Sequence, residues 1–237
     1  MTAPDHETQA RYRRRRLVAL GLLLVLVVSA GLVGGRELLL RSAWFRLASV
    51  TVIGAQDVSP ALIRAASGLR NGLPLLLVNL AAAQRAVAAI PSVASVRASR
   101  HWPDTVELTV TERRPVAVAA SPNGPRLVDR TGLAYRLAGE HAGSLPRLAV
   151  ARVAPDDPAT QAGLAVLDAL PATVRDQLQV IEAVGPRMVI LRLTNGKQVR
   201  WGDPGDSDRK AAVLAVLLSQ SASVYDVSAP ELPTIHR

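Results

Sequence analysis

The sequence predicts an α+β protein carried on a single N-terminal transmembrane helix. Residues 17–35 carry no charge, residues 47–115 follow the order β-α-α-β-β, and the later residues alternate apolar and polar positions between turn signals. We therefore expect a cytoplasmic basic tail, a transmembrane helix, a stalk and two extracytoplasmic domains, over residues 1–16, 17–35, 36–46, 47–115 and 116–237.

The uncharged segment has the length of a membrane span. At a helical rise of about 1.5 Å per residue it extends roughly 28 Å, close to the thickness of the hydrocarbon core of a bilayer. Arginine-rich flanks stay on the cytoplasmic side, so the topology of the chain is set by the residues just before the span. The sequence predicts a single-pass protein of the inner, cytoplasmic membrane, with its bulk outside, oriented by Arg13, Arg14, Arg15 and Arg16.

Two other interpretations of this segment stay open. A signal peptide also has a basic start and an apolar stretch, and Val28-Ser29-Ala30 could form its cleavage site, although apolar character continues to Val33. A buried core helix would show a polar face, and none exists between Leu17 and Val28. A membrane anchor fits the pattern best.

The composition argues against nucleic acids and cofactors. The net charge is +9, but residues 1–46 hold eight arginines against three acids, which leaves +4 for all the rest. Only seven aromatic residues occur, one Phe, three Tyr and three Trp, so no platform for stacking bases is expected. With no cysteine and four isolated histidines, we expect no disulfide, metal site or cofactor.

The first domain is expected to form a three-stranded sheet with two helices on one side. Residues 50–54 read as a strand, and Ser59-Pro60 and Asn79 each provide a helix start. Gly68 and Pro91 end these helices, and two further strands cover residues 93–100 and 105–111.

An aromatic pair, Trp44-Phe45, lies between the span and the first domain. Tryptophan is enriched at membrane interfaces, so the pair could belong to an interfacial belt. It could equally pack onto the first domain. The sequence leaves both interpretations open.

The second domain is expected to be a curved, mainly antiparallel sheet backed by helices. A helix with leucines at helical spacing ends at Pro171, and Asn195-Gly196 predicts a hairpin turn with positive φ at both central residues. Ser207 is expected to cap the final helix. The apolar positions assigned to strands are Leu178, Val180, Val189, Leu191, Leu193, Val199, Trp201, Tyr225 and Val227.

The order of these features resembles a known family. Val96, Arg100, Trp102-Pro103-Asp104 and the run 112–117 are similar to the polypeptide-transport-associated (POTRA) domain of the bacterial cell-division family FtsQ/DivIB. The later segments 127–132, 145–148, 196–203 and 224–227 are similar to the second domain of that family. The resemblance covers roughly residues 12–235.

No catalytic pattern stands out. Ser207-Asp208-Arg209-Lys210 matches S-x-x-K, but the S-D-N and K-T-G partners of that chemistry do not occur, and helix capping explains the serine. Asp156-Asp157 reads as a solvent-facing pair in a loop. We therefore expect no enzyme. The alternatives are a membrane-anchored cell-wall enzyme or accessory factor with unrecognised catalytic residues and, less favoured, an outer-membrane assembly factor.

The resemblance implies a non-enzymatic scaffold of the septal division complex, or divisome. Its partners would be FtsB-like and FtsL-like small bitopic proteins, captured by β-strand addition at the C-terminal sheet edge. From the residues alone, the tail could instead simply end the sheet, with Pro230 and Pro233 guarding it from aggregation. The implied partner-binding residues are Val224, Tyr225, Asp226, Val227, Ser228, Ala229 and Leu232, with Arg209 and Lys210 beside them. Proline at Val227 or Ala229 would then remove an edge donor.

Overall fold

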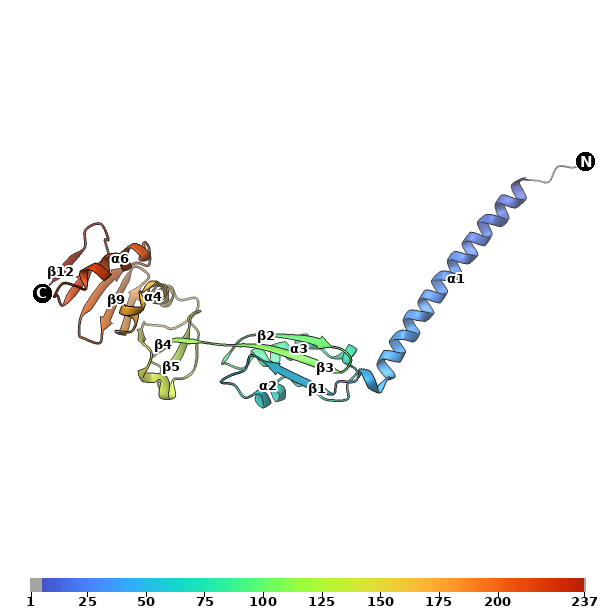
Figure 1. Ribbon diagram of the computed structural model, residues 1–237, viewed down its shortest axis with the longest axis horizontal. Coiled ribbons are helices and arrows are strands. Elements are labelled where there is room, and N and C mark those ends of the chain that lie inside the picture. Colours follow the sequence, from blue (N-terminus) through green and yellow to red (C-terminus); the bar gives the residue numbers. More distant parts are fainter. Residues whose placement is uncertain (1–5, 237) are drawn as a thin grey trace, which may run out of the picture. The chain divides into compact units, whose positions relative to one another are not determined.

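The computed structural model describes the backbone of residues 6–236 and the side chains of residues 19–36 and 42–236 (Figure 1). It begins with one long helix, α1 (His6–Arg41), and divides into two compact units at Glu112/Arg113. Within α1, the window Ala19–Arg36 has a mean hydropathy of 2.0 and no buried residue, which argues against a core helix. The topology residues Arg13, Arg14, Arg15 and Arg16 have side chains outside the described set.

The first domain has the predicted elements in the predicted order. Its three-stranded sheet has the order β1-β3-β2, with β1 parallel and β2 antiparallel to β3. The elements are η1 (Ala43–Phe45), β1 (Ser49–Ile53), α2 (Pro60–Ala66), η2 (Leu75–Leu77), α3 (Leu80–Ala88), β2 (Val93–His101) and β3 (Thr105–Glu112).

Period-two alternation along β3 places one face of this sheet in the core. Val106, Leu108 and Val110 are buried, and they share a cluster with Ile63 of α2 and Val87 of α3. Both helices therefore cover the same face, as predicted. Their starts are also as predicted, because Ser59 and Asn79 accept backbone hydrogen bonds from Ala61 and Ala82.

The second domain is a nine-stranded sheet with the order β12-β11-β10-β9-β8-β7-β4-β5-β6. Its strands are β4 (Pro115–Ala119), β5 (Arg126–Asp129), β6 (Ala134–Leu137), β7 (Arg147–Ala149), β8 (Leu178–Gly185), β9 (Met188–Leu193), β10 (Gln198–Gly202), β11 (Val224–Asp226) and β12 (Thr234–His236). Its helices are η3 (Gly139–Gly143), α4 (Pro158–Ala169), α5 (Ala172–Arg175) and α6 (Ser207–Leu217).

The sheet is mixed. Among the described residues, five of its eight strand pairings are antiparallel. Two strands that run parallel need a long crossover between them, and helices α4 and α6 supply it for the pairs β7–β8 and β10–β11. The α+β class is as predicted, with more parallel pairing than the hairpin signals indicated.

Three local predictions in this domain were wrong. A register shift between Leu178 and Val180 turns Val180 out of the core, and Ile181 is buried instead. Asn195-Gly196 does join β9 to β10, but only Gly196 takes positive φ, at 80°, because the loop is longer than a two-residue turn. Ser207 is the first residue of α6, and Asp206 precedes it as N-cap.

One ion pair ties the start of the second domain together. Arg113 Nη1 lies 2.6 Å from Asp129 Oδ2, and both side chains are largely buried. The other oxygen of Asp129 accepts hydrogen bonds from the backbone N–H of Thr131 and Leu133 and from the Thr131 hydroxyl. Burial raises the pKa of Asp129, but these hydrogen bonds outweigh it and hold the pKa below its usual value.

Candidate partner-binding edge of the second sheet

Strand β12 forms one end of the nine-stranded sheet. It pairs antiparallel with β11, in the register Val224↔His236, Tyr225↔Ile235 and Asp226↔Thr234. In the part of the chain that the structure describes, no strand pairs with its other side. This side offers unpaired backbone groups to an added strand.

The resemblance places the edge within residues 224–235, and the strand at the end of the sheet in this region is β12, not β11. Gln198 N–H donates to the Ser223 carbonyl, and Val227 N–H donates to the Arg200 carbonyl at 3.0 Å, so β11 lies between β10 and β12. The prediction that a proline at Val227 removes an edge donor is wrong. Such a proline would remove a hydrogen bond inside the sheet.

Strand β12 was missed because it has only three residues and follows two prolines. Pro230 and Pro233 read as the end of regular structure, whereas they bound a loop that returns the chain to β11 (Figure 1). The signal that could have revealed it is the β-branched pair Thr234-Ile235, in which an exposed residue precedes a half-buried one.

The hydrogen-bond alternation fixes which backbone groups of β12 face outward. The Ser223 carbonyl and the Val227 N–H bond to β10, so the N–H and C=O of Val224 and Asp226 point toward β12, and the His236 carbonyl, which accepts from Ser223 N–H at 2.9 Å, points toward β11. Tyr225 and Ile235 then form a non-hydrogen-bonded pair. The N–H and C=O of Ile235 consequently point away from the sheet.

The nine predicted partner-binding residues divide into three sets by burial. Tyr225, Val227 and Lys210 are buried, since the first two face the core and the third is held by a loop. For Lys210 this corrects the expectation of an exposed helix residue. Val224 and Asp226 are half-buried in β11. The exposed set consists of Ser228, Ala229, Leu232 and Arg209.

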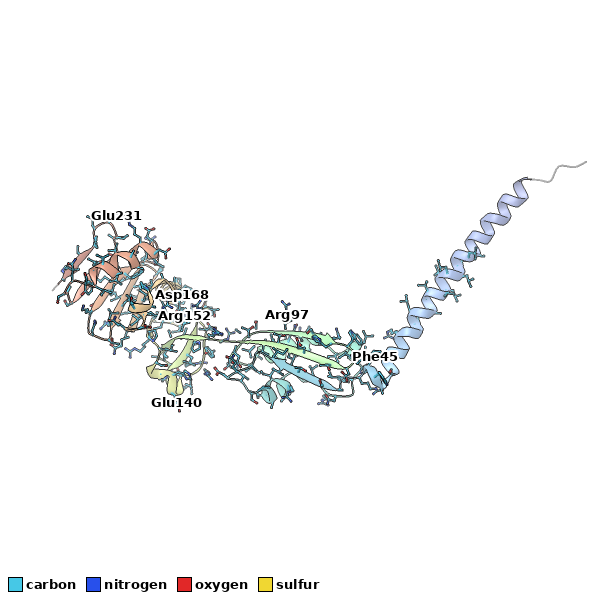
Figure 2. All side chains as sticks on the ribbon, viewed as in Figure 1. Phe45, Arg97, Glu140, Arg152, Asp168 and Glu231 are labelled. Carbon is cyan, nitrogen blue, oxygen red and sulfur yellow. The ribbon has the colours of Figure 1, made fainter. Side chains whose placement is uncertain are left out.

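Three residues of the exposed set, Ser228, Ala229 and Leu232, lie on the loop that leads into β12. Arg209 of α6 forms an ion pair with Glu231, which joins the helix to this loop (Figure 2 labels Glu231). Leu232 follows and is 80% exposed. An apolar side chain therefore stands in solvent next to the open edge.

Lys210 has a structural contact in place of a binding surface. Its Nζ donates to the Asp203 carbonyl at 2.8 Å and lies 3.2 Å from Asp203 Oδ1. The hydrogen bond from Lys210, followed by one from Gly205 N–H, lowers the pKa of Asp203 despite some burial. Lys210 thus fixes the loop between β10 and α6, which explains why the S-x-x-K pattern occurs without partners.

Support for the edge comes from β10 and β11. Trp201 is fully buried, and its Nε1 donates to Ser207 Oγ at 3.2 Å. Tyr225 is also fully buried, and its hydroxyl donates to the Gln220 carbonyl at 2.8 Å. Lys197 Nζ lies 5.3 Å from the centre of the Tyr225 ring. Large packed side chains therefore hold the two strands that carry β12.

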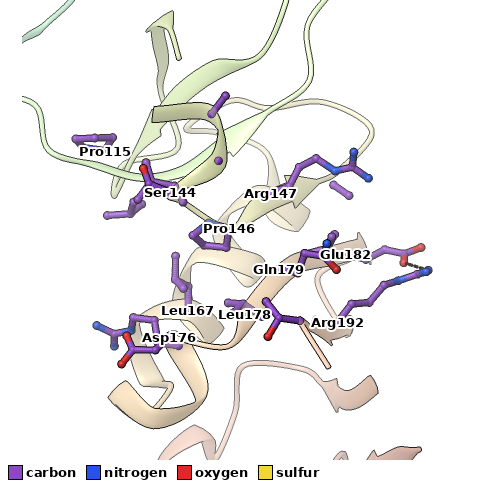
Figure 3. Close-up of a pocket in the computed structure, with 18 of the residues that line it drawn as sticks. Pro115, Ser144, Pro146, Arg147, Leu167, Asp176, Leu178, Gln179, Glu182 and Arg192 are labelled. Atoms are coloured by element: carbon purple, nitrogen blue, oxygen red, sulfur yellow. Dashed lines mark hydrogen bonds and ion pairs between the residues drawn. The ribbon is translucent and has the colours of Figure 1, made fainter. Parts of the chain in front are cut away.

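Apart from the open edge, the second domain has a cleft between β7, β8, β9 and the end of α4 (Figure 3). This cleft has a volume of about 1200 Å³ and a lining of both polar and apolar side chains. Glu182 Oε2 lies 2.7 Å from Arg192 Nη2, an ion pair on the wall of the cleft. The Ser144 hydroxyl donates to the His141 carbonyl. Among the described residues, no group of three His, Cys, Asp or Glu side chains is placed to hold a metal ion.

Comparison with known proteins gives matches for both domains. Residues 45–113 match the family model "POTRA domain, FtsQ-type", and residues 117–229 match "Cell division protein FtsQ/DivIB, C-terminal". Strand β12 follows the second matched region. The sequence resemblance that rested on scattered motifs is thus confirmed over most of the chain.

Relatives named cell division protein FtsQ align with the chain in several actinobacteria. The protein of Mycobacterium leprae is 40% identical over 79% of this chain and 54% of its own length. That of Mycobacteroides abscessus is 34% identical over 90% of this chain and 69% of its own. That of Streptomyces bingchenggensis is 31% identical over 94% of this chain and 89% of its own length.

The alignment with the M. leprae protein spans about half of that relative's length, whereas the Streptomyces protein is covered almost throughout. The two family models cover the β-α-α-β-β domain and the mixed sheet with helices, which follow the N-terminal apolar helix in the chain. The chain belongs to the cell division protein FtsQ/DivIB family.

Proposed function

We propose that this protein is a non-enzymatic scaffold of the septal cell-division complex, anchored in the cytoplasmic membrane by α1. The second domain captures small bitopic partners of the FtsB and FtsL kind by adding one of their strands to β12. The observation that carries this proposal is the open side of β12, where the N–H and C=O of Ile235 point outward.

The short edge suits a moderate, reversible association. A net gain of about 0.5–1.5 kcal/mol per hydrogen bond means that the few outward groups of β12 supply only part of the binding free energy. Leu232, exposed beside the edge, would supply apolar contact. Arg209 and Glu231, paired on the neighbouring surface, would add polar contacts at the rim.

The test is a proline at Ile235. Because the N–H of Ile235 faces away from β11, Ile235→Pro removes an outward donor and no hydrogen bond to β11. We expect co-purification of the partners with the full chain in detergent to fall at least tenfold, equivalent to a loss of about 1.4 kcal/mol.

The matched control is Ile235→Ala, which removes the same side chain but keeps the N–H. It should retain capture close to that of the wild type, and circular dichroism should show both variants folded. Partner recovery with Ile235→Pro equal to that with Ile235→Ala would refute strand addition at this edge.

We further propose that the N-terminus is cytoplasmic and that both domains are outside. Five arginines before the span against one directly after it support this orientation. Because the chain has no cysteine, single substitutions give unique labels. In cells with a permeabilised outer envelope, an impermeant maleimide should label Arg64→Cys, an exposed position on α2. It should label Thr8→Cys only after lysis. The reverse pattern would contradict the orientation.

A further inference from the structure

The first domain exposes large apolar side chains at one end of its sheet. Trp44 is 79% exposed, Leu77 60% and Trp102 50%. Leu73 and Leu76 are also exposed, and together we call these five residues the Trp-Leu surface. Solvent-exposed apolar residues that gather in this way mark an interaction site.

Backbone, ring and side-chain contacts bring together the three segments of this surface, around residues 44–47, 73–77 and 100–102. Leu47 N–H donates to the Leu73 carbonyl at 2.8 Å, which fixes the segment after η1 to the loop before η2. The rings of Phe45 and Trp102 contact edge to face, with centres 5.7 Å apart. Arg100, two residues before Trp102, donates to the Leu75 and Val78 carbonyls.

The aromatic pair therefore divides its roles. Phe45 packs onto the domain through Trp102, whereas Trp44 stays in solvent beside it (Figure 2 labels Phe45). Of the two interpretations from sequence, packing onto the first domain therefore holds for Phe45, and an interfacial role stays open for Trp44. What remains to be explained is why an exposed tryptophan stands there.

The distance along the chain places this surface at the membrane. The apolar window ends at Arg36, and Trp44 follows eight residues later. The uncharged residues 17–35 cover about 28 Å, so the hydrocarbon core of about 30 Å ends near Arg36, and a headgroup layer about 5–7 Å thick takes up roughly the next five residues. Residues 42–44 thus emerge where the headgroups end.

The charges on this surface suit a lipid headgroup layer. Arg46 is exposed, and its Nη1 donates to the Gly72 carbonyl, so a cation lies beside the loop that carries Leu73. Arg70 is exposed on the same loop. The acidic neighbour, Asp104, is half-buried and accepts a hydrogen bond from Thr105. Exposed cations beside tryptophan and leucine match anionic headgroups over acyl chains.

We propose that the Trp-Leu surface is a second membrane contact, which seats the first domain in the headgroup layer of the outer leaflet. This inference rests on the proposed anchor, because α1 must cross the membrane for the surface to reach it. Tryptophan favours this layer, because its ring is apolar and its N–H can stay in contact with water at the level of the headgroups. The first domain would then be held against the bilayer and not swing freely on its stalk.

The test uses the full chain in phospholipid vesicles that contain phosphatidylglycerol. A fluorophore is attached at Leu77→Cys or at the control Leu62→Cys, which is 54% exposed in the first turn of α2. Leu62 follows the end of β1 that pairs with Thr109, whereas the Trp-Leu surface lies at the end that pairs with Thr105. The two labels therefore report opposite ends of the domain.

Lipids that carry a quencher in the headgroup region should remove roughly half of the emission at position 77 and little at position 62. Equal quenching at both positions overturns the proposal. The proposal is also overturned if an added partner protein shields the fluorophore at position 77 from the quencher, because the surface would then bind protein and not lipid.

Flotation separates this proposal from the anchor. Chains that float with the vesicles but show no quenching at position 77 refute the surface contact alone. Chains that fail to float refute the anchor and this inference with it.

The intrinsic tryptophans give a second readout. Trp201 is fully buried in the second domain, so the double variant Trp44→Phe, Trp102→Phe leaves only a protected ring. Quenching of the wild type by the same lipids should disappear in this variant. Persistence of the quenching would show that the Trp-Leu surface does not cause it, and would count against the proposal.

Discussion

Replacement of Trp201 by alanine is expected to lower the free energy of unfolding of the second domain by about 3–5 kcal/mol. The side chain is fully buried among leucines and valines of the sheet and of α6, and its loss leaves a cavity that these residues cannot fill. Its Nε1 also stops donating to Ser207, whose hydroxyl in turn donates to the Pro204 carbonyl. The loop between β10 and α6 is loosened as well.

The two domains are separate units, so their unfolding need not be a single transition. Circular dichroism of the full chain during heating should show a lower melting temperature for one transition only in Trp201→Ala. Trp44→Ala is the matched control, because that tryptophan is exposed, and should change stability by less than about 0.5 kcal/mol. Equal effects of the two variants would contradict the burial of Trp201.

Weaker partner capture should accompany the loss of stability. Trp201 belongs to β10, which pairs with β11, and β11 in turn pairs with β12. A loosened β10 would leave the open edge less well held. At low temperature, where the domain stays folded, the amount of partner captured by Trp201→Ala should therefore lie between the amounts captured by the wild type and by Ile235→Pro.

Local signals predicted the first domain well because each of its elements carries its own signal. Ser59, Asn79 and the alternation along β3 act over a few residues and need no distant partner. The family resemblance added the identity of the second domain. The motif residues of the first domain also have structural reasons, for example Glu112 at the end of β3, whose carboxylate accepts hydrogen bonds from the backbone N–H of residues 56–58.

The candidate site was harder to predict because it depends on contacts between distant segments. Whether β11 or β12 forms the edge is decided by the return of the chain after Pro233, and the local signal for this return is only the short β-branched pair Thr234-Ile235. Lys210 reads as a surface residue, and only the fold brings Asp203 to it. The sequence therefore revealed β11 as a terminal strand, and only the fold shows that β12 pairs outside it.

Asp129 is expected to be the most sensitive acidic residue of the second domain. Asp129→Asn removes the charge that pairs with Arg113, in a place where both side chains are largely buried. Breaking a buried pair costs about 3–5 kcal/mol, and asparagine, which keeps one acceptor oxygen, should lie at the lower end. Asp156→Asn is the control, because its ion pair with Arg152 is exposed and should be worth less than about 1 kcal/mol.

The effect of Asp129→Asn should depend on pH in a defined direction. Hydrogen bonds from Thr131 and Arg113 outweigh burial and lower the pKa of Asp129 in the folded state, so the unfolded state takes up the proton first as the pH falls. The stabilisation is therefore complete above about pH 4, the unfolded pKa, and is lost as the pH falls through the folded pKa. Denaturant unfolding should give a constant difference between wild type and variant from pH 7 to 5, and a smaller one toward pH 3. Because Asp157 and Asp203 are present in both proteins, their own titration cancels. A difference that stays constant down to pH 3 would mean that the ionised carboxylate of Asp129 is not what stabilises this turn.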